Sequence, residues 1–137
     1  MNHTLAIIKP DAVAGGRTGL IVAHLEGAGF RLLAARLLTL TRADARAFYA
    51  VHRERPFYDS LVAFMTSGPC LPVVLEAPGA VAKLRETIGS TDPAEAAVGT
   101  VRQRYAESKE RNAVHGSDSD ANALREIGFF FAEREWR

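Results

Sequence analysis

The chain has 137 residues and a formal net charge of +1, with 17 lysines and arginines against 16 aspartates and glutamates. With this balance the protein has no overall positive potential that would attract nucleic acid or an anionic membrane, so we expect neither as a partner. Cys70 is the only cysteine, which excludes an internal disulfide and a cysteine-rich metal site. No apolar run approaches the roughly 18 residues that cross a bilayer, and the first residues show no leader pattern. We expect one domain over residues 1–137 and a cytoplasmic location.

The first part of the chain alternates a strand pattern with a helix pattern. Residues 4–8 are apolar and β-prone, and Lys9 follows them at the point where a proline ends the ladder. Residues 14–19 are glycine-rich but match neither the dinucleotide-binding nor the P-loop pattern, so they predict a turn. Thr18 is then the expected N-cap of a helix over residues 20–28, whose apolar side chains recur at helical spacing.

The segment of residues 30–40 is ambiguous because apolar side chains occupy both its odd and its even positions. Periodicity slightly favours a helix, whereas apolarity on both faces suits a central strand that is covered on both sides. Residues 42–52 follow a threonine that can cap them, and they predict a helix with Phe48 and Val51 turned inward. After a charged break that contains proline, residues 57–66 predict a second helix. The two helices would form a hairpin.

Two strands and two helical segments are predicted in the second half of the chain. Residues 70–76 predict a strand interrupted by Pro72, which implies an edge position or a bulge. Residues 78–88 predict a helix and residues 100–105 a helical turn, while the aromatic run at residues 128–132 predicts a last buried strand. This order predicts an α+β fold: a ferredoxin-like antiparallel sheet covered by helices on one face, with an inserted helical hairpin.

One histidine lies in the segment Asn-Ala-Val-His-Gly-Ser-Asp-Ser (residues 112–119), where no bulky neighbour would bury it. A neutral imidazole is a nucleophile, and the glycine after His115 allows a substrate to approach closely. A helix over residues 121–127, capped by the Ser-Asp-Ser before it, would carry Glu126 back towards the ring, where a carboxylate can orient one nitrogen. The alternative is a loop histidine beside an ordinary helix cap.

Cationic side chains stand at element ends or in loops at Lys9, Arg85 and Arg102. A polyphosphate needs donors from several directions, and arginine supplies bidentate ones. Taken singly, each cation is more often a solvated charge. The sequence does not show whether the three converge.

Several separated motifs resemble those of the nucleoside diphosphate kinase family. They are Ile-Lys-Pro-Asp (residues 8–11), Arg-Pro-Phe (55–57), Ser-Gly-Pro (67–69), Thr-Asp-Pro (91–93), Gly-Thr-Val-Arg (99–102), the histidine segment (112–119) and Glu-Ile before an aromatic run (126–127). The resemblance extends over residues 4–131, and it favours a strand over residues 30–40.

The resemblance implies that a nucleoside triphosphate phosphorylates His115, which passes the phosphoryl group to a nucleoside diphosphate in a ping-pong cycle with a Mg²⁺-bound nucleotide. It also assigns roles to other side chains: Ser117 and Glu126 orient the imidazole, Tyr49 lies beside the catalytic centre, Phe57 stacks on the base, and Lys9, Arg85, Thr91, Arg102 and Asn112 hold the phosphates and ribose. The nucleotide phosphates would mainly hold the Mg²⁺, without a protein metal site. A base held by stacking predicts broad base tolerance.

The chain departs from the family pattern at three positions. Lys109 stands where the family usually has an aliphatic residue facing Phe57 across the base, although its methylene stem could still pack there. Arg104 replaces a common aspartate, and Pro72 replaces a small strand residue. Family members are generally homo-oligomers, and the short C-terminal tail resembles bacterial forms that are often tetramers, with hexamers as the alternative.

Two other functions stay open at this stage. The first is a binding or regulatory module that keeps a nucleotide cleft without turnover; the intact Lys9, His115 and Glu126 count against it. The second is nucleic-acid binding as a side activity, which the near-neutral charge disfavours and which a shallow salt dependence would reveal.

Overall fold

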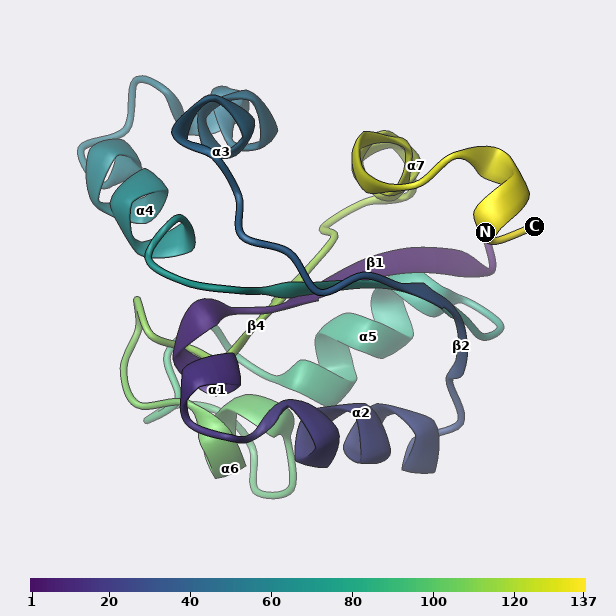
Figure 1. Cartoon of the computed structure of the whole chain (residues 1–137). Helices are drawn as coiled ribbons and strands as arrows, with labels where there is room; N and C mark the ends of the chain where they lie inside the picture. The colour runs from purple at the N-terminus through teal and green to yellow at the C-terminus, as the bar shows by residue number, and fades with distance from the viewer.

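A four-stranded antiparallel sheet forms the centre of the computed structural model, which describes residues 1–137 (Figure 1). Its strands are β1 (His3–Ile8), β2 (Arg31–Ala35), β3 (Leu71–Glu76) and β4 (Val114–Gly116), in the order β2-β3-β1-β4. The α-helices are α1 (Pro10–Ala14), α2 (Thr18–Gly27), α3 (Arg42–Phe48), α4 (Tyr58–Met65), α5 (Ala80–Ile88), α6 (Val101–Tyr105) and α7 (Asp120–Phe130), with short 3-10 helices at Ala50–His52 and Glu133–Glu135. The antiparallel pairing confirms the predicted ferredoxin-like sheet.

Helices cover both faces of the sheet, because β1 is apolar on both. Leu5 and Ile7 join one buried cluster with Phe48 of α3, whereas Ala6 and Ile8 join a second cluster on the opposite face. Figure 1 shows α3, α4 and α7 on one side of the sheet and α1, α2, α5 and α6 on the other. The expectation of helices on one face is therefore wrong. Successive strand side chains point to opposite faces, and in β1 both sets are buried and apolar.

The hairpin of α3 and α4 is inserted between β2 and β3, as predicted. The Thr41 hydroxyl accepts from the Asp44 backbone N–H at 3.0 Å, and the Asp44 carboxylate accepts from the Thr41 N–H at 3.3 Å. These two reciprocal hydrogen bonds form a capping box at the N-terminus of α3. The α-helix ends at Phe48, earlier than expected. In the 3-10 turn that follows, Val51 is 77% exposed, so the prediction of an inward Val51 is wrong.

The fourth strand lies elsewhere than the sequence predicted. Residues 128–132 are not a strand, because α7 continues to Phe130. The buried positions of this helix are Ala123, Glu126, Ile127 and Phe130, a spacing of three and four residues that belongs to one helix face. The aromatic β-propensity of this run is overridden by that packing. The strand that completes the sheet is β4, whose three residues are too few to form a pattern.

Pro72 lies on a central strand and not at an edge, since β3 pairs with both β1 and β2. Its carbonyl accepts from the Arg36 N–H at 3.2 Å, just beyond the end of β2 at Ala35. The missing proline N–H therefore falls where the β2 ladder has already ended. The irregularity of this pair is instead in β2, where the register shifts between Leu32 and Ala34.

The helices of this fold are short. The second helix begins at Thr18, which is its first helical residue and not the expected N-cap, and Arg17 at the cap position makes no side-chain cap bond. No helix combines the length and the apolarity that crossing a bilayer requires.

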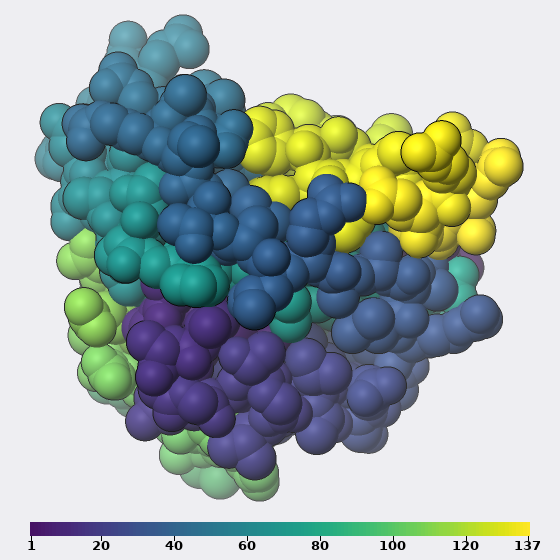
Figure 2. Space-filling view, viewed as in Figure 1, coloured from purple at the N-terminus to yellow at the C-terminus, as the bar shows by residue number.

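The C-terminal residues pack against the chain that contains β2. Figure 2 shows them in yellow, lying on the blue segment that includes β2. Arg36 Nη1 donates to the Phe130 carbonyl at 2.6 Å, its Nη2 pairs with Glu135 at 2.5 Å, and its guanidinium lies 5.1 Å from the centre of the Phe131 ring. These contacts hold α7, and with it Glu126, against the sheet.

Candidate active site

A cavity of about 860 Å³ lies between the helical hairpin, β4 and the loops that follow α5 and α6. All but one of the site residues predicted from the sequence line it, namely Lys9, Tyr49, Phe57, Arg85, Thr91, Arg102, Asn112, His115 and Glu126. The exception is Ser117, which is fully buried and contacts Glu126 from behind. Side chains that are far apart in the sequence therefore converge on one space.

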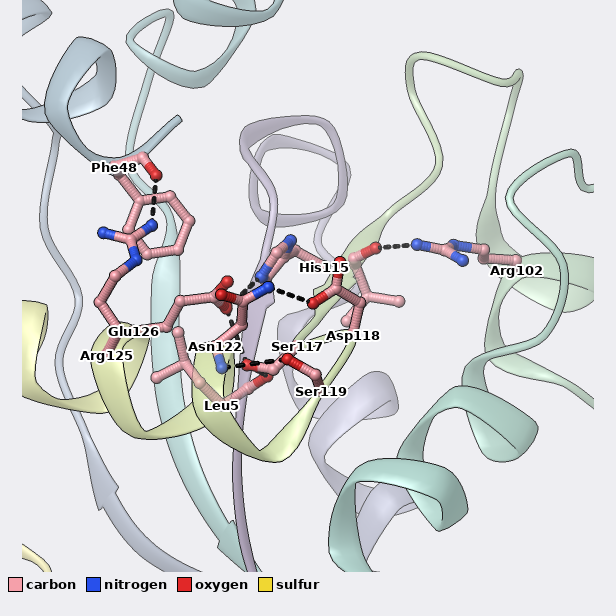
Figure 3. Close-up of polar contacts among 11 residues, drawn as sticks. Leu5, Phe48, Arg102, His115, Ser117, Asp118, Ser119, Asn122, Arg125 and Glu126 are labelled. Carbon is pink, nitrogen blue, oxygen red and sulfur yellow. Dashed lines mark hydrogen bonds and ion pairs between the residues drawn. The ribbon is translucent and has the colours of Figure 1, made fainter. Parts of the chain in front are cut away.

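The His115 ring is hydrogen-bonded to the Glu126 carboxylate, which Ser117 also binds (Figure 3). The ring is carried by β4, where His115 pairs with Ile7. Its Nε2 lies 2.7 Å from Glu126 Oε1, and the Ser117 hydroxyl donates to the same oxygen at 2.7 Å. An ionised carboxylate only accepts hydrogen bonds, so Nε2 carries the proton and Nδ1 keeps its lone pair. This tautomer leaves Nδ1 free to act as a nucleophile.

Two aromatic rings from the end of α3 enclose the imidazole. The Phe48 ring centre is 5.6 Å away and the Tyr49 ring centre 6.2 Å away, both edge-on. The His115 side chain is 19% exposed, so it is reached from the cavity and shielded elsewhere. Burial raises the pKa of Tyr49, with the Glu126 charge as a lesser cause. Its hydroxyl stays protonated, and it is buried without a hydrogen-bond partner.

The backbone just before the histidine is strained. Ala113 has φ of 73° and is the only residue other than glycine with positive φ. The Val114 N–H donates to the Asn112 carbonyl across it at 2.8 Å. An alanine with this backbone conformation costs roughly 1–2 kcal/mol. Two long-range hydrogen bonds keep Ala113 in this conformation. The Ala113 N–H donates to Asp11 Oδ2 at 3.1 Å, and the Lys9 N–H donates to the Ala113 carbonyl at 2.9 Å. Asp11 was not singled out from the sequence.

Lys9 is buried at the floor of the cavity and is tied to Asn112. Its Nζ donates to Asn112 Oδ1 at 2.8 Å, and Asn112 Nδ2 donates to the Thr91 carbonyl at 3.3 Å. Burial lowers the pKa of Lys9 to about 8, with the Arg102 charge as the second cause and Asp11 opposing it. At neutral pH the amine is still mostly charged, so an anion that enters the cavity meets a desolvated cation.

Arg102 adds a second buried cation. Its Nη1 donates to the Gly89 carbonyl at 2.9 Å and its Nη2 to the Val114 carbonyl at 2.8 Å, while Nε is buried without a partner. Burial and then the neighbouring Arg85 charge lower the pKa of Arg102 to about 10. Lys9, Arg85 and Arg102 therefore share one cavity and repel one another. Such a cluster suits a ligand that carries several negative charges.

The outer part of the cavity is more apolar. Phe57 is 49% exposed and tilts against the His52 ring, with ring centres 5.5 Å apart. Val51, Leu61 and Lys109 also line the cavity. An exposed aromatic face beside a cavity is a platform for a flat ring. Lys109 makes neither an ion pair nor a hydrogen bond, so its stem and its charge are both available there.

Arg125 and Asp118 are among the cavity residues that sequence reasoning missed. Arg125 Nη2 donates to the Phe48 carbonyl at 2.8 Å, which joins α7 to the end of α3. Asp118 Oδ1 accepts from Asn122 Nδ2 at 2.5 Å, and this hydrogen bond lowers the pKa of Asp118. The Ser-Asp-Ser cap did signal the start of the helix, because the Ser119 hydroxyl accepts from the Asn122 N–H at 3.1 Å. The contacts across the cavity left no such local signal.

Comparisons with known proteins agree on one family. A family model described as nucleoside diphosphate kinase matches residues 2–136. The chain is 57% identical to a nucleoside diphosphate kinase of Chlorobium luteolum over 98% of this chain and 96% of that protein, and 57% identical to one of Campylobacter curvus over 98% of each. Its fold is similar to the Aquifex aeolicus enzyme (TM-score 0.97, 42% identity, 99% of each chain) and to the Halobacterium salinarum enzyme in complex with CDP (TM-score 0.95, 36% identity, 100% of this chain and 92% of that one).

Proposed function

Because the chain belongs to the nucleoside diphosphate kinase family, we propose that His115 is the residue that carries the phosphoryl group between its two nucleotide substrates. The protein is a phosphotransferase, which moves the terminal phosphoryl group of a nucleoside triphosphate to a nucleoside diphosphate. The observation that carries the assignment is the 2.7 Å contact between His115 Nε2 and Glu126. It supports a ring whose Nδ1 is the free, unprotonated nitrogen.

The reaction proceeds in two half-reactions at Nδ1. In the first, the Nδ1 lone pair attacks the terminal phosphorus, the N–P bond forms, the P–O bond to the adjacent phosphate breaks, and a nucleoside diphosphate leaves. In the second, a terminal oxygen of another nucleoside diphosphate attacks the same phosphorus and the N–P bond breaks. Glu126 balances the positive charge that the ring gains on phosphorylation, and Ser117 keeps the carboxylate in place.

The cationic end of the cavity holds the phosphates. Lys9, Arg85 and Arg102 neutralise the oxygens of the transferring group, which is the main demand of phosphoryl transfer. Thr91 and Asn112 add polar contacts to the phosphates and ribose, and the Asn112 side chain is already oriented by its bond to Lys9. Tyr49, protonated and without a partner at its hydroxyl, lies beside the phosphorylated ring as a donor.

Mg²⁺ enters with the nucleotide in this proposal. Cations outnumber carboxylates among the residues that line the cavity, so these residues fit a metal ion that the phosphates mainly hold. The ion supplies charge neutralisation of the phosphate oxygens. Asp118, a carboxylate that lines the cavity, would accept hydrogen bonds from the water shell of such an ion.

The base stacks on Phe57 at the outer end of the cavity. Stacking needs only a π-face, which every base has, so we propose broad base tolerance. Lys109 supports the opposite wall through its methylene stem.

We further propose a homo-oligomer, a tetramer in preference to a hexamer, in the cytoplasm. The exposed edge of β2 supports association, because an edge strand leaves backbone groups unpaired and Leu37 beyond it is 61% exposed. Mass measurement by light scattering tests the number of subunits, and cell fractionation tests the location.

Two-substrate kinetics test the transfer itself. With ATP as donor and a nucleoside diphosphate as acceptor, double-reciprocal plots at several fixed acceptor concentrations should give parallel lines, the pattern of a ping-pong cycle. Intersecting lines would indicate direct transfer between two bound nucleotides and would exclude a phosphorylated His115. Nucleotide binding without turnover would instead favour a binding module.

A further inference from the structure

Asp11 is a buried carboxylate that the transfer chemistry does not use. It lies in the first turn of α1, two residues after Lys9, and is 7% exposed. Its Oδ2 accepts a hydrogen bond from the Ala113 N–H at 3.1 Å, although 102 positions separate the two residues. Its Oδ1 is buried without a hydrogen-bond partner. Burial of a carboxylate with one oxygen unpaired costs free energy, so the bond to Ala113 has to offset that cost.

The residues that lead into the histidine break the side-chain alternation of a strand. In a regular strand, residues three apart in the sequence point to opposite faces of the sheet. Asn112 and His115 are three apart, yet both line the cavity. Ala113 and Val114 are adjacent, yet both belong to the same buried cluster on one face of the sheet. The alternation is therefore interrupted at the start of β4.

The interruption is a tight turn centred on Ala113. Its φ is 73°, and the Val114 N–H donates to the Asn112 carbonyl at 2.8 Å, which is the hydrogen bond of a γ-turn with positive φ. From Val114 onward the chain pairs with β1, where His115 lies opposite Ile7. With His115 fixed in this ladder, an extended Ala113 would direct the Asn112 side chain away from the cavity.

The chain that follows β1 holds this turn at both of its peptide groups. The Lys9 N–H donates to the Ala113 carbonyl at 2.9 Å, and Asp11 Oδ2 accepts from the Ala113 N–H. Of these two hydrogen bonds, only the one from Asp11 involves a side chain. The Lys9 Nζ then binds Asn112 Oδ1 at 2.8 Å, inside the cavity. The orientation of Asn112 therefore depends on a strained residue that Asp11 binds.

We propose that Asp11 is a positioning residue, whose hydrogen bond to Ala113 keeps the turn formed and so directs both Asn112 and His115 into the cavity. Asp11 does not line the cavity itself. Without this bond Ala113 relaxes towards negative φ, and the conformation with both side chains in the cavity becomes a minor state. The inference rests on the proposed function, because it assumes that this conformation is the one that is phosphorylated.

A double-mutant cycle tests the proposal through the second-order rate constant for phosphorylation of His115 by ATP. Asp11→Ala should lower this constant roughly 5- to 30-fold, the population factor that corresponds to the strain of one alanine at positive φ. In an Ala113→Gly background the loss caused by Asp11→Ala should be smaller by at least about threefold, because glycine adopts positive φ without that strain. Equal losses in the two backgrounds would overturn the inference.

The loss of the Asp11 charge is common to both backgrounds, so it cancels in the cycle. Asp11→Asn removes the charge but keeps an acceptor for the Ala113 N–H, and it should lose less activity than Asp11→Ala. Equal losses in these two variants would show that the charge matters instead of the hydrogen bond. Glu126→Ala is the matched control, because Glu126 contacts the His115 ring directly. Its loss should be the same in both backgrounds, and an equal rescue by Ala113→Gly would overturn a specific role for Asp11.

The affinity for ADP, measured by calorimetry, gives a second readout that does not need turnover. The same turn directs Asn112, so Asp11→Ala should weaken ADP binding and Ala113→Gly should reduce that loss. A wild-type protein that binds ADP but is not phosphorylated would refute the proposed function, and the ADP cycle would still test this inference. Urea denaturation checks folding: an Asp11→Ala protein that is unfolded in both backgrounds would contradict a role confined to the turn.

Discussion

One oxygen of Glu126 accepts two hydrogen bonds, from His115 Nε2 and from Ser117 Oγ, each at 2.7 Å. His115 and Ser117 are separated by one residue along the chain, whereas Glu126 comes from the second turn of α7. The carboxylate therefore fixes the ring tautomer, and the serine fixes the carboxylate. The backbone strain at Ala113, directly before β4, adds to the energetic cost of this arrangement.

Removing the carboxylate should slow phosphorylation without abolishing it. Glu126→Ala is expected to lower the single-turnover rate of His115 phosphorylation by about 10- to 100-fold, the range typical of losing a group that orients a ligand or nucleophile. Ser117→Ala should give a smaller loss, because the carboxylate keeps its bond to the ring. Rapid-quench measurements check both, with the exposed Glu133→Ala as control. An unchanged rate in Glu126→Ala would contradict the orienting role.

Nucleotide affinity should fall as the pH rises through about 8. The pKa of Lys9 is lowered to about 8 by burial, so the amine is charged below this pH and neutral above it. In a His115→Ala background, the affinity for ADP should drop between pH 7 and 9.5, and adding Lys9→Met should make it weaker and independent of pH over that range. Calorimetry at several pH values checks this. The same pH dependence in both proteins would exclude Lys9 as its source.

The lowered pKa of Lys9 should make the ligand-free protein more stable as the pH rises, whereas it should make nucleotide affinity fall. Between about pH 8 and its ordinary pKa of 10.5, the unfolded chain keeps a lysine proton that the folded chain has lost. The free energy of unfolding of the ligand-free protein therefore gains a contribution as the pH rises through this window. Urea denaturation should show the difference between wild type and Lys9→Met changing with pH above 8, and a constant difference would contradict the lowered pKa.

Arg125 should position the aromatic rings around the histidine. Its Nη2 donates to the Phe48 carbonyl at 2.8 Å, and the guanidinium lies 5.7 Å from the Phe48 ring centre. Losing this hydrogen bond in Arg125→Met is expected to raise the activation free energy by about 1 kcal/mol, which lowers kcat roughly fivefold. Steady-state kinetics check this, with the exposed Arg134→Met as control. Equal kcat values in both variants would show that the bond does not matter.

The capping box of α3 should contribute to stability. Thr41→Ala removes the acceptor for the Asp44 N–H and should lower the free energy of unfolding by about 1 kcal/mol. Thr39→Ala, two residues earlier and exposed, is the control and should have little effect. Urea denaturation measures both. Equal losses in the two variants would contradict a specific cap.

Much of the fold and of the candidate site could be predicted because local signals were strong. The apolar run of β1, the threonine before α3 and the Ser-Asp-Ser before α7 each act within a few residues. The last strand was misplaced because three adjacent phenylalanines have high β-propensity, whereas the helix packs Ala123, Ile127 and Phe130 on one face. The short β4 had no periodicity from which to recognise it.

Contacts between distant segments were beyond sequence patterns. Nothing near Asp11 indicates that it accepts from Ala113, 102 residues later. Nothing in α4 indicates that Ser60 meets Glu110. The convergence of Lys9, Arg85 and Arg102 likewise depends on the whole fold, because each cation alone has the pattern of a solvated charge. Resemblance to the family implied that the three cations act together, and all three line one cavity.

The central claim is that His115 Nδ1 carries the phosphoryl group. The most direct measurement incubates the purified protein with γ-labelled ATP and no acceptor, locates the label by mass spectrometry, and then adds an unlabelled nucleoside diphosphate. We predict that label appears on Nδ1 of His115, transfers into the new triphosphate on chase, and is absent from His115→Ala. Label on another residue, or turnover of His115→Ala at the wild-type rate, would contradict the claim.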